Sequence, residues 1–193
     1  MTAIAVFHSV LGVRPGVLDA ATRLGSDGHD VLVVDQYDGK VFDEYEPAMA
    51  YAQSVGYPSL MQRAVEAVAD LPDGFVALGF SNGGAMSEYV ATARAVSGVV
   101  MLAGAMPLAE LGATAWPTGV PAQIHYTLGD PFREQSAIDA VAADVRAAGA
   151  SVEVFDYPGD GHLFTDASLP AEHDPVAAEL LWSRVLPFVT AAG

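Results

Sequence analysis

Short apolar segments alternate with longer amphipathic segments along the whole chain. Six of the apolar segments are rich in valine and isoleucine and have the length of β-strands. They span residues 3–7, 31–35, 75–80, 98–104, 122–128 and 152–157. Because these segments are apolar without strict alternation, they predict strands that are covered on both faces, as in a parallel sheet.

Most of the intervening segments carry apolar residues at helical spacing. The expected helices cover residues 15–28, a segment that starts near Ser59, and residues 84–95, 133–148 and 174–186. Ser59 and Gln62 have capping-box spacing, Asp174 can cap the last helix, and Pro187 is expected to end or kink it. Residues 105–122 show no clear period and predict a loop over the strand ends.

The alternation of strands and helices predicts an α/β fold with right-handed crossovers. We expect a mostly parallel sheet of about six to seven strands, with helices on both faces. The chain has 193 residues, of which 52% are hydrophobic and 17% are charged, which suffices for one well-filled core. A single domain over residues 1–193 is therefore predicted.

The charge of the chain limits its partners. It has 24 acidic and 8 basic residues, a formal net charge of -16, and only one lysine, Lys40. Such a surface repels nucleic acid and anionic membranes, so neither is expected as a partner. There is no cysteine, no basic leader before an apolar stretch, and no uninterrupted apolar run long enough to span a bilayer. A cytoplasmic protein is expected.

A serine between glycines follows the third apolar segment. Residues 79–83 read GFSNG, which matches the GxSxG pattern of a nucleophile on a sharp bend between a strand and a helix. Gly79 and Gly83 would remove the side chains that clash at such a bend. Because a strand is predicted before it and a helix after it, Ser81 is the predicted nucleophile rather than a residue of an ordinary turn.

An activated serine needs a base, and the base needs an acid that orients it. His162 follows the last apolar segment and Asp130 follows the one before it. The carboxyl ends of parallel strands meet at one edge of a sheet, so both residues should lie near Ser81. The chain order of serine, acid and histidine is also that of α/β hydrolases.

Other residues could take these roles. Asp130, which precedes Pro131, could start a turn or cap the helix that follows, and His162 could be an ordinary loop residue. Asp160 is a rival acid, although it is only two residues from His162. Among the other histidines, His8 is a competing base, but it stands too early in the chain for the usual order and is expected to be a loop-packing residue. His125 is predicted to be structural, and His29 and His173 have no supporting context.

A tetrahedral intermediate requires hydrogen-bond donors for its oxyanion. The backbone N–H groups of Asn82, after the nucleophile, and of Val10, after the first strand, are the predicted donors. Four further residues are candidates for lining the pocket: Ser9, Tyr37, Met106 and Trp116.

The chain resembles the dienelactone hydrolase family of small α/β hydrolases over essentially its whole length. The resemblance is carried by the opening segment "FHSVLGVRPGVLDAATRLGSDGHDVLVVDQYDG" and by "GFSNGG", "GDPF" and "YPGDGHLF". It implies an α/β hydrolase fold without a large lid domain. It also implies hydrolysis of an ester or lactone through an acyl-enzyme.

Three positions depart from the pattern of that family. The best-known members have cysteine where this chain has Ser81, glutamate at the position of Ser9, and a substrate-binding arginine at the position of Asp166. Together with Asp156 and Asp160, Asp166 favours a neutral or cationic ester over an anionic one.

The sequence therefore predicts a serine hydrolase that acts on a small ester or lactone, with Ser81, His162 and Asp130 as its triad. No cofactor and no metal ion are expected. The chain could work as a monomer or a homodimer. The alternatives are a catalytically idle scaffold that binds a small ligand and a nucleotide-binding domain, for which the glycine motifs are missing.

Overall fold

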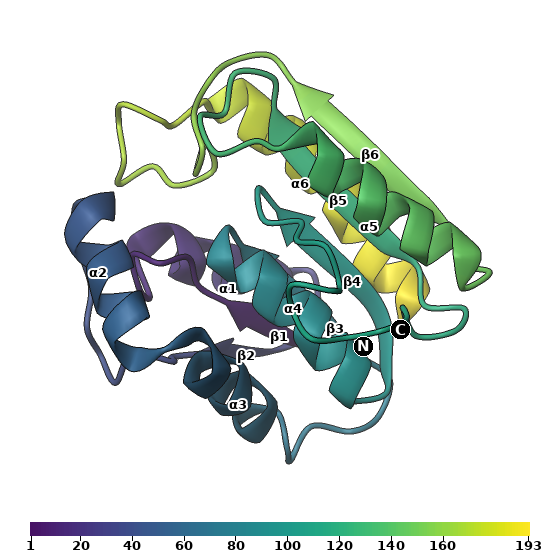
Figure 1. Cartoon of the computed structure of the whole chain (residues 1–193). Helices are drawn as coiled ribbons and strands as arrows, with labels where there is room; N and C mark the ends of the chain where they lie inside the picture. Colours follow the sequence, from purple (N-terminus) through teal and green to yellow (C-terminus); the bar gives the residue numbers. More distant parts are fainter.

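Six parallel strands form one sheet in the order β2-β1-β3-β4-β5-β6 in the computed structural model, which describes residues 1–193 (Figure 1). The strands are β1 (Ala3–Phe7), β2 (Asp30–Val34), β3 (Phe75–Phe80), β4 (Val96–Leu102), β5 (Ala122–Thr127) and β6 (Val152–Tyr157). All six predicted strands are present, each with its ends within two residues of the prediction. The α/β hydrolase fold and the parallel sheet are confirmed.

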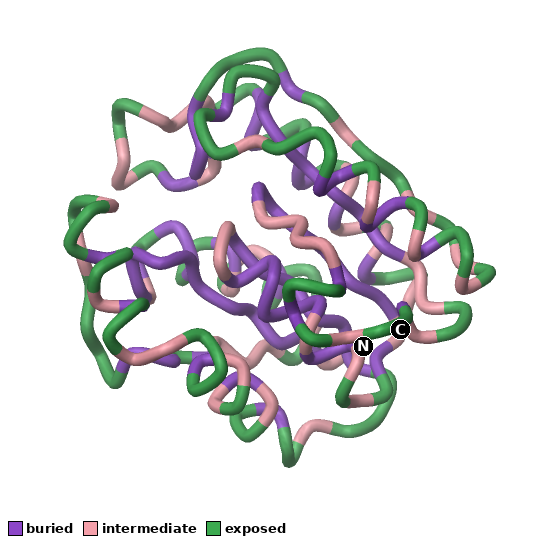
Figure 2. Tube along the Cα trace, viewed as in Figure 1, coloured by how far each residue is buried: buried purple, intermediate pink, exposed green.

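Helices cover both faces of the sheet (Figure 1). They are α1 (Pro15–Ser26), α2 (Tyr45–Val55), α3 (Tyr57–Ala67), α4 (Asn82–Ala93), α5 (Gln135–Ala147) and α6 (Pro175–Ala192). Helices α1 and α6 pack in one apolar cluster with the sheet, and α3, α4 and α5 pack in a second cluster on the other face. Figure 2 shows the buried residues concentrated along the strands, between the two layers of helices.

The pattern of the chain did not reveal α2. This helix buries only Ala48 and Ala52, so its sequence lacks the continuous apolar stripe that marks the other helices. It ends at Gly56, whose φ of 87° separates it from α3. The capping box predicted at Ser59 is wrong, because α3 begins two residues earlier, at Tyr57.

The prediction for the last helix, α6, is confirmed at its N-terminus but not at its C-terminus. The carboxylate of Asp174 accepts hydrogen bonds from the N–H groups of Val176 and Ala177, as expected of an N-cap. Pro187 does not end the helix, which continues to Ala192. Pro187 is exposed, so water can solvate the carbonyl group that proline leaves without a donor.

The strand order creates a topological switch point between β1 and β3. The chain passes from β1 outward to β2 and then returns to β3 on the other side of β1. In open parallel sheets, the crevice beyond the carboxyl ends of two such strands is where ligands bind. Val10 follows β1 and Ser81 follows β3, so both residues lie at this crevice.

No helix is both long enough and apolar enough to cross a membrane.

His125 in β5 provides a test of the core. Its ring nitrogens lie 2.8 Å from the Tyr157 hydroxyl and 3.2 Å from the Gln123 side-chain oxygen. Burial, and to a lesser extent the nearby Arg184, lowers the pKa of His125 to about 3. The unfolded chain therefore binds a proton at this residue between about pH 6.5 and pH 3, whereas the folded chain does not.

We expect His125 to lower the stability of the folded protein as the pH falls from about 6.5 toward 3. A histidine that is protonated only in the unfolded chain changes the free energy of unfolding by about 1.4 kcal/mol per pH unit in this range. The His125→Gln variant loses this contribution, so its stability deficit relative to wild type should shrink between pH 7 and pH 4.5. Urea unfolding at several pH values measures the difference, and parallel stability curves would contradict the prediction.

Candidate active site

Ser81 sits on a strained turn between β3 and α4. Its backbone has φ 51° and ψ -118°, a region that non-glycine residues rarely occupy. The turn is fixed at both ends: the Ser81 N–H donates to the Leu102 carbonyl at 2.7 Å, and the Gly84 N–H donates to the Ser81 carbonyl at 2.7 Å. The predicted strand, bend and helix around Ser81 are therefore present.

Glycine is required around this turn because backbone segments approach one another closely. A Cβ atom added at Gly79 would lie 1.8 Å from the Gly83 carbonyl oxygen, and one at Gly83 would lie 2.2 Å from the Phe7 carbonyl oxygen. Gly104, which the sequence did not single out, is equally constrained, because its Cβ atom would lie 2.0 Å from the Ser81 carbonyl oxygen. The elbow is thus packed directly against the ends of β1 and β4.

His162 connects Ser81 to Asp130. Its Nε2 atom lies 2.7 Å from the Ser81 Oγ atom, and its Nδ1 atom lies 2.8 Å from an Asp130 carboxylate oxygen. The side chains of His162 and Asp130 are 3% and 0% exposed, so water does not compete for this pair. Because a carboxylate can only accept, Nδ1 carries a proton, and the lone pair of Nε2 in the neutral ring faces the serine hydroxyl.

The rival residues do not join this group. Asp160 is exposed and makes no hydrogen bond to His162, whereas the other Asp130 oxygen accepts from the Phe132 N–H at 2.8 Å. His125 is enclosed within the sheet. Both ring nitrogens of His8 are bound to other groups, so it has no free nitrogen to act as a base toward Ser81.

The predicted oxyanion donors lie beside Ser81. Asn82 is the first residue of α4, so its backbone N–H has no acceptor within the helix, and the helix dipole adds positive potential there. The Val10 N–H, in the loop after β1, also has no acceptor in the protein. Both residues line the same cavity as Ser81 and His162.

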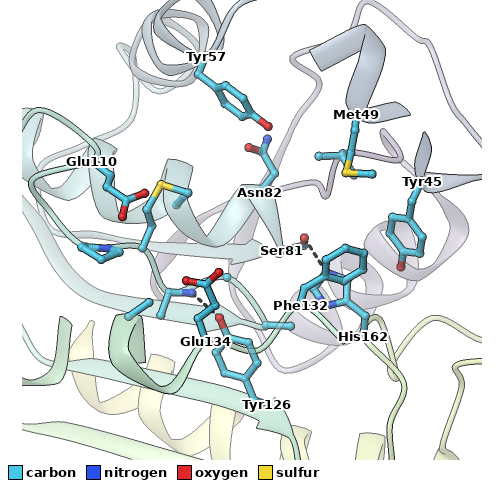
Figure 3. Close-up of a pocket in the computed structure, with 18 residues that line it drawn as sticks. Tyr45, Met49, Tyr57, Ser81, Asn82, Glu110, Tyr126, Phe132, Glu134 and His162 are labelled. Carbon is cyan, nitrogen blue, oxygen red and sulfur yellow. Dashed lines mark hydrogen bonds between the residues drawn. The ribbon is translucent and has the colours of Figure 1, made fainter. Parts of the chain in front are cut away.

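That cavity has a volume of about 270 Å³, and Figure 3 shows the side chains that line it. Its wall is mostly apolar and aromatic, with Tyr45 and Phe132 next to the His162 ring at centroid distances of 5.9 and 4.7 Å. Glu110 and Glu134 are the only carboxylates that line it, and no lysine or arginine lines it.

Of the predicted lining residues, only Met106 borders this cavity. Tyr37 is fully buried in the core against Tyr51, and Trp116 is held by a 2.8 Å hydrogen bond from its indole N–H to the Val120 carbonyl. Ser9 is buried as well, with its hydroxyl accepting from the Leu11 N–H. These three assignments are wrong, because nothing in the sequence near a residue tells whether its side chain is buried or lines a cavity.

The model of the dienelactone hydrolase family matches residues 1–193. This chain belongs to that family. No curated protein matches the chain. The family and the fold make the protein a hydrolase.

Solved structures share the fold at low sequence identity. A dienelactone hydrolase-like promiscuous phosphotriesterase from metagenomic libraries is 20% identical, with a TM-score of 0.80, covering 100% of this chain and 87% of the other. A dienelactone hydrolase from Klebsiella pneumoniae, described as putative, is 18% identical, with a TM-score of 0.76 and coverage of 98% and 87%. Thermogutta terrifontis esterase 2, phosphoramylated by tabun, is 15% identical, with a TM-score of 0.66 and coverage of 100% and 83%.

Asp166 stands where the resemblance implies a substrate-binding arginine in the best-known members, and it is buried away from the cavity. One of its oxygens lies 3.4 Å from the Arg14 Nε atom, and the other accepts from the Ser168 N–H and hydroxyl. Asp156 pairs with Arg133 at 2.7 Å. The acidic residues predicted to repel anions therefore do not line the cavity, whereas Glu110 and Glu134 do.

Two supporting residues were not predicted from the sequence. The Glu88 carboxylate accepts from the Met106 N–H at 2.8 Å, and the Tyr126 hydroxyl accepts from the Ala105 N–H at 2.9 Å. Burial raises the pKa of Glu88 well above its usual value and that of Tyr126 to about 12. Both groups fix the cavity wall after β4, and no local motif marks them.

The buried Arg14–Asp166 pair should be important for stability. Arg14 also donates to the Phe42 carbonyl, the Asp43 carboxylate and the Ser168 hydroxyl, so it links three loops. The Arg14→Met variant leaves a buried carboxylate without its cation, and we expect a loss of about 3–5 kcal/mol. Urea unfolding measures this loss.

Two further variants separate the charge effect from lost packing. In Arg14→Met/Asp166→Asn the unpaired charge is gone, so the double variant should be more stable than Arg14→Met alone. Arg23→Met removes an exposed pair with Glu179 and should change stability far less. Equal losses of stability in Arg14→Met and Arg23→Met would contradict the importance of the buried Arg14–Asp166 pair.

Proposed function

We propose that the protein cleaves a carboxylic ester or lactone through Ser81, His162 and Asp130. The observation that carries this proposal is the pair of hydrogen bonds on opposite sides of the His162 ring, to the Ser81 hydroxyl and the Asp130 carboxylate. A buried imidazole in this state can take the serine proton while the carboxylate stabilises the resulting imidazolium. A binding scaffold without activity would not need this arrangement.

The reaction follows from these positions. Ser81 Oγ attacks the substrate carbonyl carbon as its proton passes to His162 Nε2, and the carbonyl oxygen becomes an oxyanion near the Asn82 and Val10 N–H groups. When the intermediate collapses, His162 gives the proton to the leaving alkoxide. Water then attacks the acyl-enzyme with His162 again as the base, releasing the acid and restoring Ser81.

A fluorophosphonate tests the nucleophile directly. We expect one covalent adduct in the intact mass of the wild-type protein, no adduct in Ser81→Ala, and labelling at least about 100-fold slower in His162→Ala. Ser87→Ala is a matched control, because this buried serine of α4 donates to the Gly84 carbonyl and faces no base. A folded wild type that stays unlabelled would support an idle scaffold instead.

We propose further that the substrate is neutral or cationic rather than anionic. The support is the cavity wall, which holds Glu110 and Glu134 and no basic side chain. Both glutamates are exposed, so water and salt weaken their effect on a ligand charge. Their influence should nevertheless add to that of the net charge of -16.

Esters that differ only in the charge at the end of the acyl chain test this preference. The value of kcat/KM should be about 3- to 10-fold higher for a trimethylammonium ester than for the carboxylate ester, with the methyl ester between them. Replacing Glu110 and Glu134 by glutamine, or adding 0.5 M salt, should reduce the difference. Fastest turnover of the carboxylate ester would contradict the proposal.

A further inference from the structure

His8 is a fully buried histidine at the end of β1 that the proposed reaction does not use. Its Nδ1 atom lies 2.6 Å from the Ser9 carbonyl oxygen, and its Nε2 atom lies 3.1 Å from the Gln36 backbone nitrogen. A carbonyl can only accept and an amide N–H can only donate, so Nδ1 must carry the proton and Nε2 must accept. His8 is therefore a neutral ring with a fixed tautomer.

Its surroundings favour this neutral state. The Tyr37 ring packs against His8 at an angle, with a centroid distance of 4.6 Å, and no part of His8 is exposed to water. Burial lowers the pKa of His8, against smaller opposing effects of the Ser9 carbonyl and Asp35. A proton on Nε2 would also face the Gln36 N–H, which is itself a donor.

The bond from His8 fixes the peptide group that carries one of the predicted oxyanion donors. The Ser9 carbonyl and the Val10 N–H belong to the same planar trans peptide, so they point in opposite directions. The carbonyl is held by His8 and also accepts from the Gly12 N–H at 3.1 Å. The Val10 N–H has no acceptor in the protein, and Val10 lines the cavity with Ser81.

We propose that His8 is a positioning residue for the oxyanion hole. Its Nδ1–H group holds the Ser9 carbonyl and thereby keeps the Val10 N–H directed toward the reacting carbonyl. This inference rests on the proposed serine hydrolase function. It also accounts for a buried histidine close to the site that can take no part in proton transfer.

Three substitutions separate the donor of His8 from its volume. The side-chain amide of asparagine can place a donor near the position of Nδ1, whereas that of glutamine reaches the position of Nε2. His8→Asn can therefore keep the bond to Ser9, His8→Gln can keep only the bond from Gln36, and His8→Ala loses both.

With a neutral p-nitrophenyl ester, we expect kcat to fall about 10- to 100-fold in His8→Gln and His8→Ala, somewhat less than the loss of a whole oxyanion donor. KM should change little, because the donor acts on the transition state. His8→Asn should recover most of kcat. The pH–rate profile should keep its shape in all variants, since the Ser81–His162–Asp130 group is untouched.

A trifluoromethyl ketone, which forms a tetrahedral adduct with an active serine, gives a second measurement. Its affinity should fall in parallel with kcat in His8→Gln and His8→Ala, while the affinity of a non-reactive amide analogue stays constant. Unchanged kcat in His8→Ala, or equal losses in His8→Asn and His8→Gln, would overturn the proposal.

The tautomer can be measured without turnover. In ¹⁵N NMR of the wild-type protein, His8 should show a protonated Nδ1 and an unprotonated Nε2 at neutral pH, and the opposite pattern would overturn the proposal. Failure of the proposed function has a different signature, because Ser81 of the wild type would then form no adduct with either the fluorophosphonate or the ketone.

Discussion

The close packing of backbone around Ser81 is the constraint on which the rest of the site depends. The end of β3, the start of α4 and the ends of β1 and β4 approach so closely that glycine is needed at Gly79, Gly83 and Gly104. The contacts hold Ser81 in a conformation that costs on the order of 1–3 kcal/mol by itself. They also bring the N-terminus of α4 beside the loop after β1, so both predicted oxyanion donors lie next to Ser81.

The histidine loop is held by a second set of contacts that involves distant parts of the chain. The Glu172 carboxylate accepts from the Leu163 N–H at 2.6 Å, next to His162, and from the Tyr45 hydroxyl. Arg14 ties the same loop to the segment after β1 through Asp166. His162 therefore owes its position to side chains from α2, from the loop after β1 and from its own loop.

The sequence predicted the strands and the serine, histidine and aspartate group because the signals for these features are local. Ser81 is marked by its flanking glycines, and Asp130 and His162 directly follow apolar strands that end at the same edge. The cavity wall could not be predicted in this way. Tyr37 and Trp116 lie in the core, whereas Tyr45 and Phe132 face the site, and nothing near them in the sequence distinguishes these environments.

Helix α2 has a consequence for how relatives of this protein can diverge. It lies outside the sheet, is separated from α3 by Gly56, and gives Tyr45 and Met49 to the cavity without supplying any reacting group. Changes at Met49 can reshape the cavity, whereas Tyr45 is tied to the histidine loop through its hydrogen bond to Glu172. A single helix thus carries one residue that shapes the cavity and another that holds the histidine loop in place.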